Sequence, residues 1–455
     1  MNNGLNAFFK AESIAVVGAS SKEGKTGHTI LKNLINSGFQ GMIYPINPNS
    51  DNILWLKAYP NLKTVGRNVD LVVFTIPAHG LPEAMKEAGE MGVKAAVIIT
   101  GGLGEIGNHE LEQEVLNIAR SYQIRVIGPN CQGISYTHNN LCASWPLTTV
   151  KGSIAIISQS GTIGAALSGW AQNEQIGISG CVSLGNKADV DECDLLEYFA
   201  DDPNTSVIAL NIEGVSNGAR FLEVCHRVSV NKPIVVLKPG RSQKGKEAAA
   251  SHTKSVAGNA EVFEAVCRRA HLIQARNTTE FFDFTKALAL SQSINSTEIS
   301  IITSSGGSGI LAVDSAEDEG LEVIDLFPEI LEELKEKLPS HCVIRNPLDL
   351  TGDSDAERFY ISTEVIGKQA PGAFLLIYGD PILGAAEVTD RIAKSRKITP
   401  VCCYIGGGDV EREEVVRLQQ LGYPTFPVPE RAIAAIRVLY QYNRYVNETR
   451  RIQSV

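Results

Sequence analysis

One histidine of the sequence, His252, has neighbours that suit a catalytic role. His252 lies between hydroxyl residues in the small-residue segment Ala250–Gly258, and Arg241, Lys244 and Lys246 precede it. An imidazole with an ordinary pKa of about 6.5 is a nucleophile near neutral pH, and nearby cations attract phosphate. The segment predicts a histidine that accepts a phosphoryl group. An ordinary exposed loop histidine is the alternative that these residues leave open.

Glu213 could assist that histidine. It follows the apolar run that begins at Val207, and ligand sites of α/β proteins gather at the ends of such strands. A carboxylate there can hold the ring N–H of a reacting histidine and stabilise the charged imidazole. We therefore predict that Glu213 partners His252. A solvated acid at a strand end is the alternative.

Two glycine-containing turns could bind phosphate. Gly18–Gly27 follows an apolar run and carries Lys22 and Lys25, and Ser158–Gly161 follows another such run. A helix that starts at such a turn presents free N–H groups and the positive end of its dipole. The second turn lacks the G-x-S-x-G pattern, so a nucleophile elbow is not expected there.

The first turn fits a phosphate-rich nucleotide better than a nicotinamide dinucleotide. Its glycines do not follow the GxGxxG spacing, and the next strand ends in Ile46–Asn49. An Asp or Glu would bind the ribose hydroxyls at that point, but the nearest acid is Asp51. A turn that merely closes the fold is the remaining alternative.

A third glycine-containing segment, Gly240–Lys246, resembles a phosphate-binding P-loop but fails at its end. Glu247 stands where a Ser or Thr hydroxyl would hold Mg²⁺. A carboxylate there would repel the phosphates. The sequence therefore contains no P-loop.

The elements that must position these residues alternate between strand and helix. Short continuous apolar runs separated by helices of ten or more residues predict parallel strands buried on both faces. In the first part of the chain we expect strands at 13–18, 42–46, 71–76, 95–100 and 124–127, with helices at 26–36, 81–91 and 109–122.

Two later parts of the chain resemble each other. Three segments match in the same order, which predicts a duplicated α/β domain. The pairs are Ile154–Gly164 with Ile299–Gly309, Val207–Gly214 with Ala373–Asp380, and Pro233–Gly240 with Pro400–Gly407. With Ser291–Thr297 as a polar linker and 431–445 as a closing helix, the predicted domains are 1–130, 150–290 and 298–455.

Composition limits the class of protein. The chain has 455 residues, is 44% hydrophobic and 20% charged, and has a net charge of −10. This balance argues against nucleic acid as the main partner, and no run reaches the length of a membrane helix. The nine cysteines have no metal-binding spacing and mostly lie in apolar runs, so we expect small core residues in a reducing, cytoplasmic setting.

Five stretches of the sequence, taken in order, resemble the α subunit of the ADP-forming acetyl-CoA synthetases, relatives of succinyl-CoA synthetase. The resemblance covers essentially the whole chain. The stretches are Ile127–Gly133 (IGPNCQG), Ile157–Gly161 (ISQSG), Ser183–Asp191 (SLGNKADVD), Ser251–Thr253 (SHT) and Ser255–Gly258 (SVAG).

The resemblance implies an α/β fold in which a Rossmann-like CoA-binding domain precedes two flavodoxin-like ligase-CoA domains. It implies the reversible conversion of acyl-CoA, ADP and phosphate to a carboxylic acid, ATP and CoA. The route passes through an acyl phosphate and a phosphohistidine at His252, which Glu213 steadies.

The resemblance also implies binding residues, with CoA on the first domain and phosphate at a helix start in the second. The CoA residues are Gly18, Ser20, Ser21, Lys22, Gly24, Asn47, Thr100, Gly101, Gly102, Asn130 and Cys131, and the phosphate residues are Gln159, Ser160 and Gly161. No residue is assigned to a metal.

Three assigned domains leave no segment for a nucleotide site. The resemblance therefore implies a separate ATP-grasp β subunit in an α₂β₂ complex, which would bring ADP or ATP and Mg²⁺. Acyl-CoA and inorganic phosphate would be the substrates, and the acyl group is not fixed by the sequence.

The sequence departs from the family pattern at two places, of which the first, Lys254, supports an alternative function and the second concerns domain docking more than chemistry. Lys254 replaces the usual glycine after the SHT triplet, and Ser304–Gly309 replaces the usual Asn-Ala-Gly-Gly-Pro-Gly. Glycine adopts a positive φ freely and lysine does not, so the loop can differ in conformation. The alternative is a non-catalytic CoA-binding or regulatory paralogue of the same fold.

Overall fold

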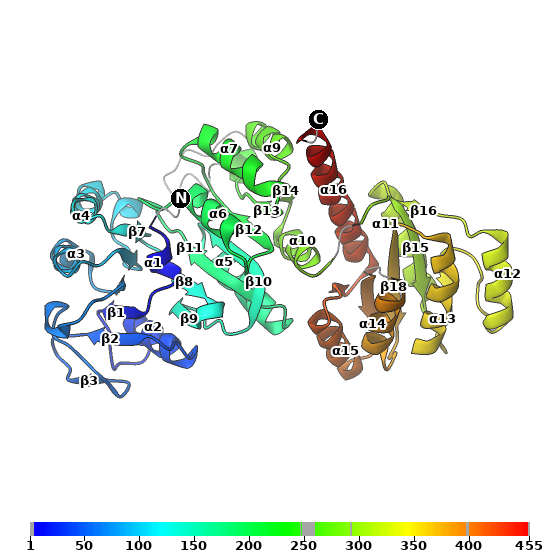
Figure 1. The fold of residues 1–455 in the computed structure, drawn as a ribbon, viewed down its shortest axis with the longest axis horizontal. Coiled ribbons are helices and arrows are strands. Elements are labelled where there is room, and N and C mark those ends of the chain that lie inside the picture. The colour runs from blue at the N-terminus through cyan, green and yellow to red at the C-terminus, as the bar shows by residue number, and fades with distance from the viewer. Residues whose placement is uncertain (1–3, 246, 248–259, 292–293, 397–399, 454–455) are drawn as a thin grey trace. The chain divides into compact units, whose positions relative to one another are not determined.

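A computed structural model describes residues 4–245, 247, 260–291, 294–396 and 400–453 (Figure 1). His252 and Lys254 lie outside the described residues. The chain divides into two compact units, Met1–Asn173 with Gly177–Arg276, and Glu174–Ile176 with Asn277–Val455. Among the described residues, no helix has both the length and the apolar character needed to cross a membrane.

The first sheet of unit 1 is wholly parallel, in the strand order β2-β1-β5-β6-β7. Its five strands are apolar runs buried in the middle of a layered structure, as the sequence predicts. They are β1 (Ser13–Val17), β2 (Met42–Ile46), β5 (Leu71–Phe74), β6 (Ala95–Ile98) and β7 (Arg125–Ile127), and the helices are α2 (Thr26–Asn36), α3 (Leu81–Glu90) and α4 (His109–Ser121).

The second sheet of unit 1 has the strand order β14-β13-β12-β10-β11-β8-β9. Its last two strands form an antiparallel hairpin that the sequence analysis does not predict. The strands are β8 (Gly133–Tyr136), β9 (Leu141–Ser144), β10 (Lys151–Ser158), β11 (Ile178–Ser183), β12 (Val207–Asn211), β13 (Ile234–Leu237) and β14 (Ile273–Ala275), and the helices are α5 (Gly161–Asn173), α6 (Glu192–Asp201), α7 (Gly218–Ser229) and α9 (Ala260–Arg269).

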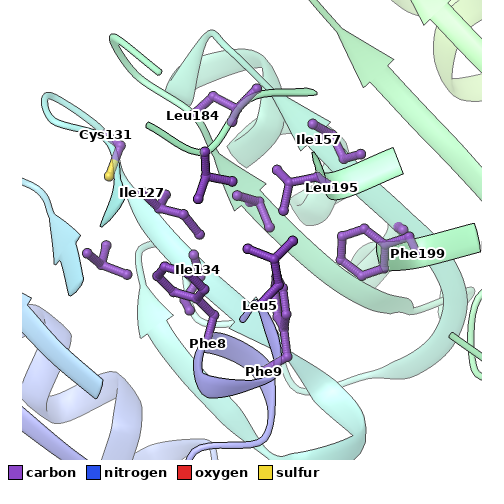
Figure 2. Packing of buried hydrophobic residues seen from close by; sticks show 14 of the residues in the cluster. Leu5, Phe8, Phe9, Ile127, Cys131, Ile134, Ile157, Leu184, Leu195 and Phe199 are labelled. Carbon is purple, nitrogen blue, oxygen red and sulfur yellow. The ribbon is translucent and has the colours of Figure 1, made fainter. Parts of the chain in front are cut away.

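A shared apolar core joins the two sheets of unit 1. Helix α1 (Asn6–Phe9) inserts Phe8 and Phe9 between them (Figure 2). The Phe9 ring stacks on Tyr198 with a centroid distance of 4.5 Å and lies 5.4 Å from Phe199. Because aromatic burial is a large stabilising contribution, this contact fixes the first sheet against the second sheet.

Unit 2 contains a third sheet, in which β15 is flanked by β16 and β18 and the order continues to β19 and β20. Helices α10, α11 and α16 contribute to the core on one face, and α12 to α15 to the core on the other. The strands are β15 (Glu298–Thr303), β16 (Glu322–Val323), β17 (Leu348–Asp349), β18 (Ala373–Gly379), β19 (Val401–Ile405) and β20 (Thr425–Phe426), and the helices are α10 (Thr278–Leu290), α11 (Gly306–Asp318), α12 (Pro328–Lys337), α13 (Ala356–Ile366), α14 (Ala385–Arg396), α15 (Asp409–Gln420) and α16 (Pro429–Gln453).

In each of the three larger sheets, the first parallel strand lies between the next strand of the chain and a later one. The neighbours are β2-β1-β5, β11-β10-β12 and β16-β15-β18. Such a reversal of strand order opens a crevice at the carboxyl ends of the two central strands, where α/β proteins bind ligands. The second and third sheets share this pattern in the three segments that the sequence repeats, which confirms their structural similarity.

Candidate active site at the carboxyl edges of the two sheets of unit 1

The turn after β1 is shaped by close backbone approach. Gly18 has φ +91°, and a Cβ on it would lie 2.8 Å from Thr75 Oγ1. A Cβ on Gly27 would lie 2.1 Å from the carbonyl oxygen of Gly18, so only glycine fits there. No described side chain caps the N-terminus of α2. The first turn of this helix therefore offers N–H groups that suit a phosphate.

Several predicted CoA residues shape this turn rather than point freely from it. Ser20 Oγ accepts a hydrogen bond from the Lys22 N–H at 3.1 Å. Asn47 Nδ2 donates to the Ala19 carbonyl at 2.7 Å, so Asn47 ties the end of β2 to the turn. Ser21, Lys22 and Gly24 are exposed. The sequence analysis gives no role to His28, whose ring nitrogen Nδ1 lies 3.0 Å from the Ser20 carbonyl.

The turn after β6 joins the same edge. Thr100 Oγ1 donates to the Ile76 carbonyl at 2.7 Å, and the Glu105 carboxylate accepts hydrogen bonds from the Gly102 and Leu103 N–H groups. Burial raises the pKa of Glu105, but hydrogen bonds from Asn186 and from this backbone outweigh it and hold the pKa below its ordinary value. The turn is therefore held by a carboxylate.

Asn130 and Cys131 follow β7 and face different ways. Asn130 is exposed, has φ +56°, and donates its N–H to the Thr100 carbonyl at 3.0 Å. The Cys131 side chain is only 6% exposed, and its Sγ lies 3.4 Å from the Ile98 carbonyl within the core (Figure 2). Burial raises the pKa of this thiol to about 12, so it is neutral at ordinary pH. A ligand would contact residue 131 through its main chain.

The turn after β10 meets the end of β12. Gln159 Oε1 accepts hydrogen bonds from the N–H groups of Glu213 at 2.9 Å and Gly214 at 3.4 Å. Helix α5 begins at Gly161, where a Cβ would lie 2.6 Å from the Gln132 side chain. The structure thus brings the predicted phosphate residues and Glu213 together. The Gln159 side-chain oxygen, however, already accepts a hydrogen bond from the Glu213 N–H.

One carboxylate oxygen of Glu213 is buried and lacks a hydrogen-bond donor among the described residues. The residue is 8% exposed, and its Oε2 accepts no hydrogen bond from any described residue. Its carbonyl oxygen accepts from Lys238 Nζ at 2.7 Å. Because buried polar atoms are normally hydrogen-bonded, Oε2 is suited to a donor that approaches from outside the described residues.

The loop after β11 supplies residues to which the sequence analysis gives no role. Asn186 Nδ2 donates to Glu105 Oε2 at 2.8 Å and to Glu112 Oε2 at 2.9 Å. Lys187 Nζ contacts Glu192 Oε2 at 2.8 Å and the Gly214 carbonyl at 2.5 Å. The SLGNKADVD stretch signals this loop, but sequence alone does not show which distant groups it reaches.

A small cavity lies beneath the start of α5. Its volume is about 10 Å³, and Gln132, Ser135, Gly161 and Ser168 are among its lining residues. Ser135 is buried, and its Oγ has no hydrogen-bond partner among the described residues. A cavity of this size that reaches a buried hydroxyl suits a single water molecule.

The described residues contain no group of three or more His, Cys, Asp or Glu side chains that could hold a metal ion. All nine cysteines are free thiols, and eight are buried. The prediction that most of them pack as small core residues is confirmed.

Three family models match the chain in order. They are a CoA binding domain at residues 12–137, a succinyl-CoA ligase like flavodoxin domain at 151–288, and a Ligase-CoA domain at 299–449. These matches and the parallel sheets confirm the predicted fold class. The boundaries 1–130, 150–290 and 298–455 stay a prediction, since the contacts join the first two sheets in one unit.

Known proteins are similar over the whole chain. The α subunit of ADP-forming acetate–CoA ligase I from Pyrococcus furiosus is 39% identical over 97% of this chain and 98% of its own length. The ADP-forming acetate–CoA ligase of Methanocaldococcus jannaschii is 40% identical over 95% of this chain, which spans only 62% of that protein. A solved acetyl-coenzyme A synthetase 1 from Ca. Korarchaeum cryptofilum, in complex with phosphate and ADP, matches with a TM-score of 0.92 and 37% identity over 100% of both chains.

The fold and the paired sheet edges define a protein of the succinyl-CoA-ligase-like α/β class. Within that class, the chain belongs to the ADP-forming acetate–CoA ligase family.

Proposed function

We propose that this chain is the α subunit of an NDP-forming acyl-CoA synthetase, which converts acyl-CoA, ADP and phosphate reversibly to a carboxylic acid, ATP and CoA. The observation that carries the proposal is the buried, unpartnered Oε2 of Glu213 at the end of β12. The segment that contains His252 leaves the neighbouring strand β13, and Lys238 at that strand end already contacts Glu213. A histidine from this segment can supply the missing donor.

The reaction would proceed in three steps. A phosphate oxygen bonds to the acyl carbon of the thioester, and the CoA sulfur leaves and takes up a proton. A ring nitrogen of His252 then bonds to phosphorus, and the carboxylate of the acid leaves. Finally the phosphoryl group passes from His252 to a terminal oxygen of ADP, which gives ATP and frees the imidazole.

The chain's own residues would position each reactant. The N-terminus of α5, with Gly161 and Ser160, presents N–H groups and a positive dipole to phosphate. Glu213 would accept the ring N–H of His252 and stabilise the imidazole as it gains charge. Because little covalent chemistry is left to the protein, positioning and charge stabilisation supply the catalysis.

The residues of the first sheet fit CoA as a ligand. Gly18, Gly27 and Gly102 leave this edge without side chains at their positions, and the uncapped start of α2 lies there with exposed Lys22 and Lys25 nearby. Phosphate groups of CoA would be bound here, and CoA would supply the thiol that carries the acyl group. Main-chain groups of Thr100, Gly101, Asn130 and Cys131 would border the thioester end.

We propose that the nucleotide is held by a separate ATP-grasp β subunit in a cytoplasmic α₂β₂ complex. The P. furiosus relative is named as an alpha subunit, and the M. jannaschii relative is longer than this chain. Mg²⁺ would enter with that partner.

Phosphorylation of the copurified complex tests the proposal. With acetyl-CoA and radiolabelled inorganic phosphate, the wild-type α chain is expected to gain acid-labile phosphate, and His252→Asn is expected to gain none. Wild-type labelling that persists in His252→Asn would contradict the assignment of the nucleophile.

The alternative, a non-catalytic CoA-binding paralogue, rests on Lys254. It predicts tight CoA binding without phosphate incorporation across a panel of acyl-CoAs. It also predicts that Lys254→Gly stays unlabelled, whereas under the proposed function both wild type and Lys254→Gly become labelled.

A further inference from the structure

The loop between β11 and α6, residues 184–191, is fixed to the first sheet edge. The N–H of Asn186 donates to the Pro129 carbonyl at 2.9 Å, and that of Ala188 to the Gly128 carbonyl at 3.1 Å. A Cβ on Gly185 would lie 2.2 Å from the Pro129 carbonyl oxygen, so the backbones touch. The position of the loop is therefore set by the Gly128–Asn130 turn, to which its backbone is hydrogen-bonded.

The same loop reaches the second sheet edge through one buried cation. The Lys187 side chain is 8% exposed, and its partner Glu192 is 2% exposed. Lys187 also has φ +46°, a conformation that lysine adopts only where its surroundings enforce it. Its second contact is the Gly214 carbonyl, one residue beyond Glu213.

The backbone around Glu213 is consequently held from three directions. Gln159 Oε1 holds the N–H groups of Glu213 and Gly214, Lys238 holds the Glu213 carbonyl, and Lys187 holds the Gly214 carbonyl. Fixing the peptide units on both sides of a residue fixes the direction in which its side chain leaves the backbone. The Oε2 atom of Glu213 is buried and has no hydrogen-bond donor among the described residues.

A buried ion pair is weak evidence for stability, because desolvation of two charges offsets their attraction. Well-packed apolar residues would fill this space at similar stability, but they could not hold a carbonyl oxygen at a set place. Lys187 and Glu192 are therefore better explained by the geometry that they impose than by the stability that they add.

We propose that Lys187 is a positioning residue for Glu213, and that Glu192 fixes the Lys187 ammonium for this role. The proposal rests on the proposed function, in which Glu213 steadies His252. Because the Lys187 loop also binds the Gly128–Asn130 turn, it sets the place of the carboxylate relative to the edge where the thioester would lie.

Unit 2 offers a matched control. Lys286 is 1% exposed, and its Nζ contacts Glu174 Oε2 at 2.9 Å and the Thr425 carbonyl at 2.7 Å. It is thus another buried lysine with one glutamate and one carbonyl as partners. Its partners, Glu174, Thr425, Phe282 and Phe426, all belong to unit 2.

The experiment compares Lys187→Met, Lys187→Arg and Lys286→Met in the complex with its nucleotide-binding partner. Melting temperature, kcat, the KM values for acetyl-CoA and phosphate, and the pH profile of His252 phosphorylation are measured. Both methionine variants are expected to melt earlier. Only Lys187→Met is expected to lose kcat, by roughly 10- to 100-fold, with little change in the KM for acetyl-CoA.

The pH profile separates positioning from general loosening. A carboxylate beside an imidazole raises the imidazole pKa, and only the neutral imidazole attacks phosphorus. A misplaced Glu213 therefore shifts the acidic limb of the Lys187→Met profile to lower pH, and Lys187→Arg restores part of the rate and the limb. If Lys187→Met does not fold, Glu192→Gln, which keeps the carbonyl contact but removes the ion pair, replaces it.

Equal losses in kcat for Lys187→Met and Lys286→Met, or an unshifted pH profile, would overturn the positioning role. The proposed function is judged separately, on wild-type phosphorylation and its loss in His252→Asn. Wild-type labelling with an unshifted Lys187→Met profile therefore rejects only the positioning role, whereas absent wild-type labelling rejects the function on which it rests.

Discussion

The carboxyl edges of the second and third sheets share one backbone arrangement but carry different side chains. Strand registers pair Ser158 with Asn211 in one and Thr303 with Ile377 in the other, so Glu213 corresponds to Gly379. In both, the residue after the first strand accepts a hydrogen bond from this strand end at 2.9 Å: Gln159 from Glu213, and Ser304 from Gly379. The backbone arrangement is duplicated, and the carboxylate is not.

The strand-end carbonyls extend the contrast. At the second sheet, Lys238 donates to the Glu213 carbonyl at 2.7 Å, whereas at the third sheet Ser304 Oγ itself donates to the Gly379 carbonyl at 2.9 Å. One serine thus makes the contacts that Gln159 and Lys238 make together. At the second sheet, the buried cation of Lys238 holds the backbone of a residue that carries a carboxylate, Glu213. At the third sheet, where Gly379 replaces that residue, the neutral hydroxyl of Ser304 makes the equivalent contact.

The helix starts differ in charge as well. A Cβ on Gly161 would meet the neutral Gln132 side chain at 2.6 Å, and a Cβ on Gly306 would meet Asp349 Oδ2 at 2.7 Å. An acid at a helix N-terminus occupies the position that favours an anion. The start of α5 is therefore suited to phosphate, and the start of α11 is already supplied with negative charge.

The largest expected effect comes from removing the charge of Glu213. Glu213→Gln is expected to slow His252 phosphorylation by about 100-fold or more, because a neutral amide does not stabilise the charged imidazole. Asp380→Asn removes an exposed carboxylate beside Gly379 at the equivalent edge and should leave the rate within about twofold. Rapid-quench measurement of acid-labile phosphate gives both rates. Similar losses in the two variants would show that the two edges do not differ in function.

Exchanging the charges at the two helix starts tests the phosphate site. Gln132→Glu places a carboxylate beside the start of α5 and is expected to raise the KM for phosphate about tenfold through repulsion. Asp349→Asn removes the corresponding charge at α11 and should leave that KM unchanged. Steady-state kinetics at varied phosphate decide the outcome, with the KM for acetyl-CoA as an internal reference. A phosphate KM that responds to Asp349→Asn instead would place the site on the third sheet.

Gln159→Met and Ser304→Ala test whether the shared hydrogen bonds are structural in both places. Each leaves a strand-end N–H without its acceptor, so each is expected to lower the free energy of unfolding by about 1–2 kcal/mol. Only Gln159→Met should also reduce kcat, since only its partner is proposed to act as a catalytic carboxylate. Denaturant unfolding and turnover of the same preparations give the two quantities. Reduced turnover in Ser304→Ala would contradict the assignment of catalysis to one edge.

Strong periodic patterns made much of the fold predictable from sequence. The helix expected at 26–36 is α2, the strand expected at 42–46 is β2, and the repeat of Ile154–Gly164 in Ile299–Gly309 matches equivalent strand-turn-helix units. Long amphipathic helices and buried strands can be recognised from the pattern of apolar residues in their own sequence. The four-residue α1 and the β8–β9 hairpin cannot, because α1 takes its place from the core between the two sheets and the hairpin takes its place from pairing with β11.

The candidate site was predictable only where its residues end strands. Glu213 and Gln159 follow β12 and β10, which are neighbours, so their proximity follows from topology. Lys187 and Lys238 reach the same backbone from other strands, and no spacing in the sequence reports that convergence. Asn47 was predictable as a residue of the edge, but its bond to the Ala19 carbonyl was not.

The smallest expected effect concerns Cys131, which the family resemblance places beside the thioester. Its thiol is buried with a pKa raised to about 12, so at pH 8 little thiolate is present and alkylation should be slow. Burial also raises the pKa of Cys342 in unit 2, which is likewise buried. Cys131→Ala and Cys342→Ala are each expected to lower the free energy of unfolding by about 1 kcal/mol and to keep activity within about threefold. Because both thiols are buried and only Cys131 has a role in the family resemblance, a selective loss of kcat in Cys131→Ala would show that sulfur, rather than the main chain of residue 131, contacts the reacting groups.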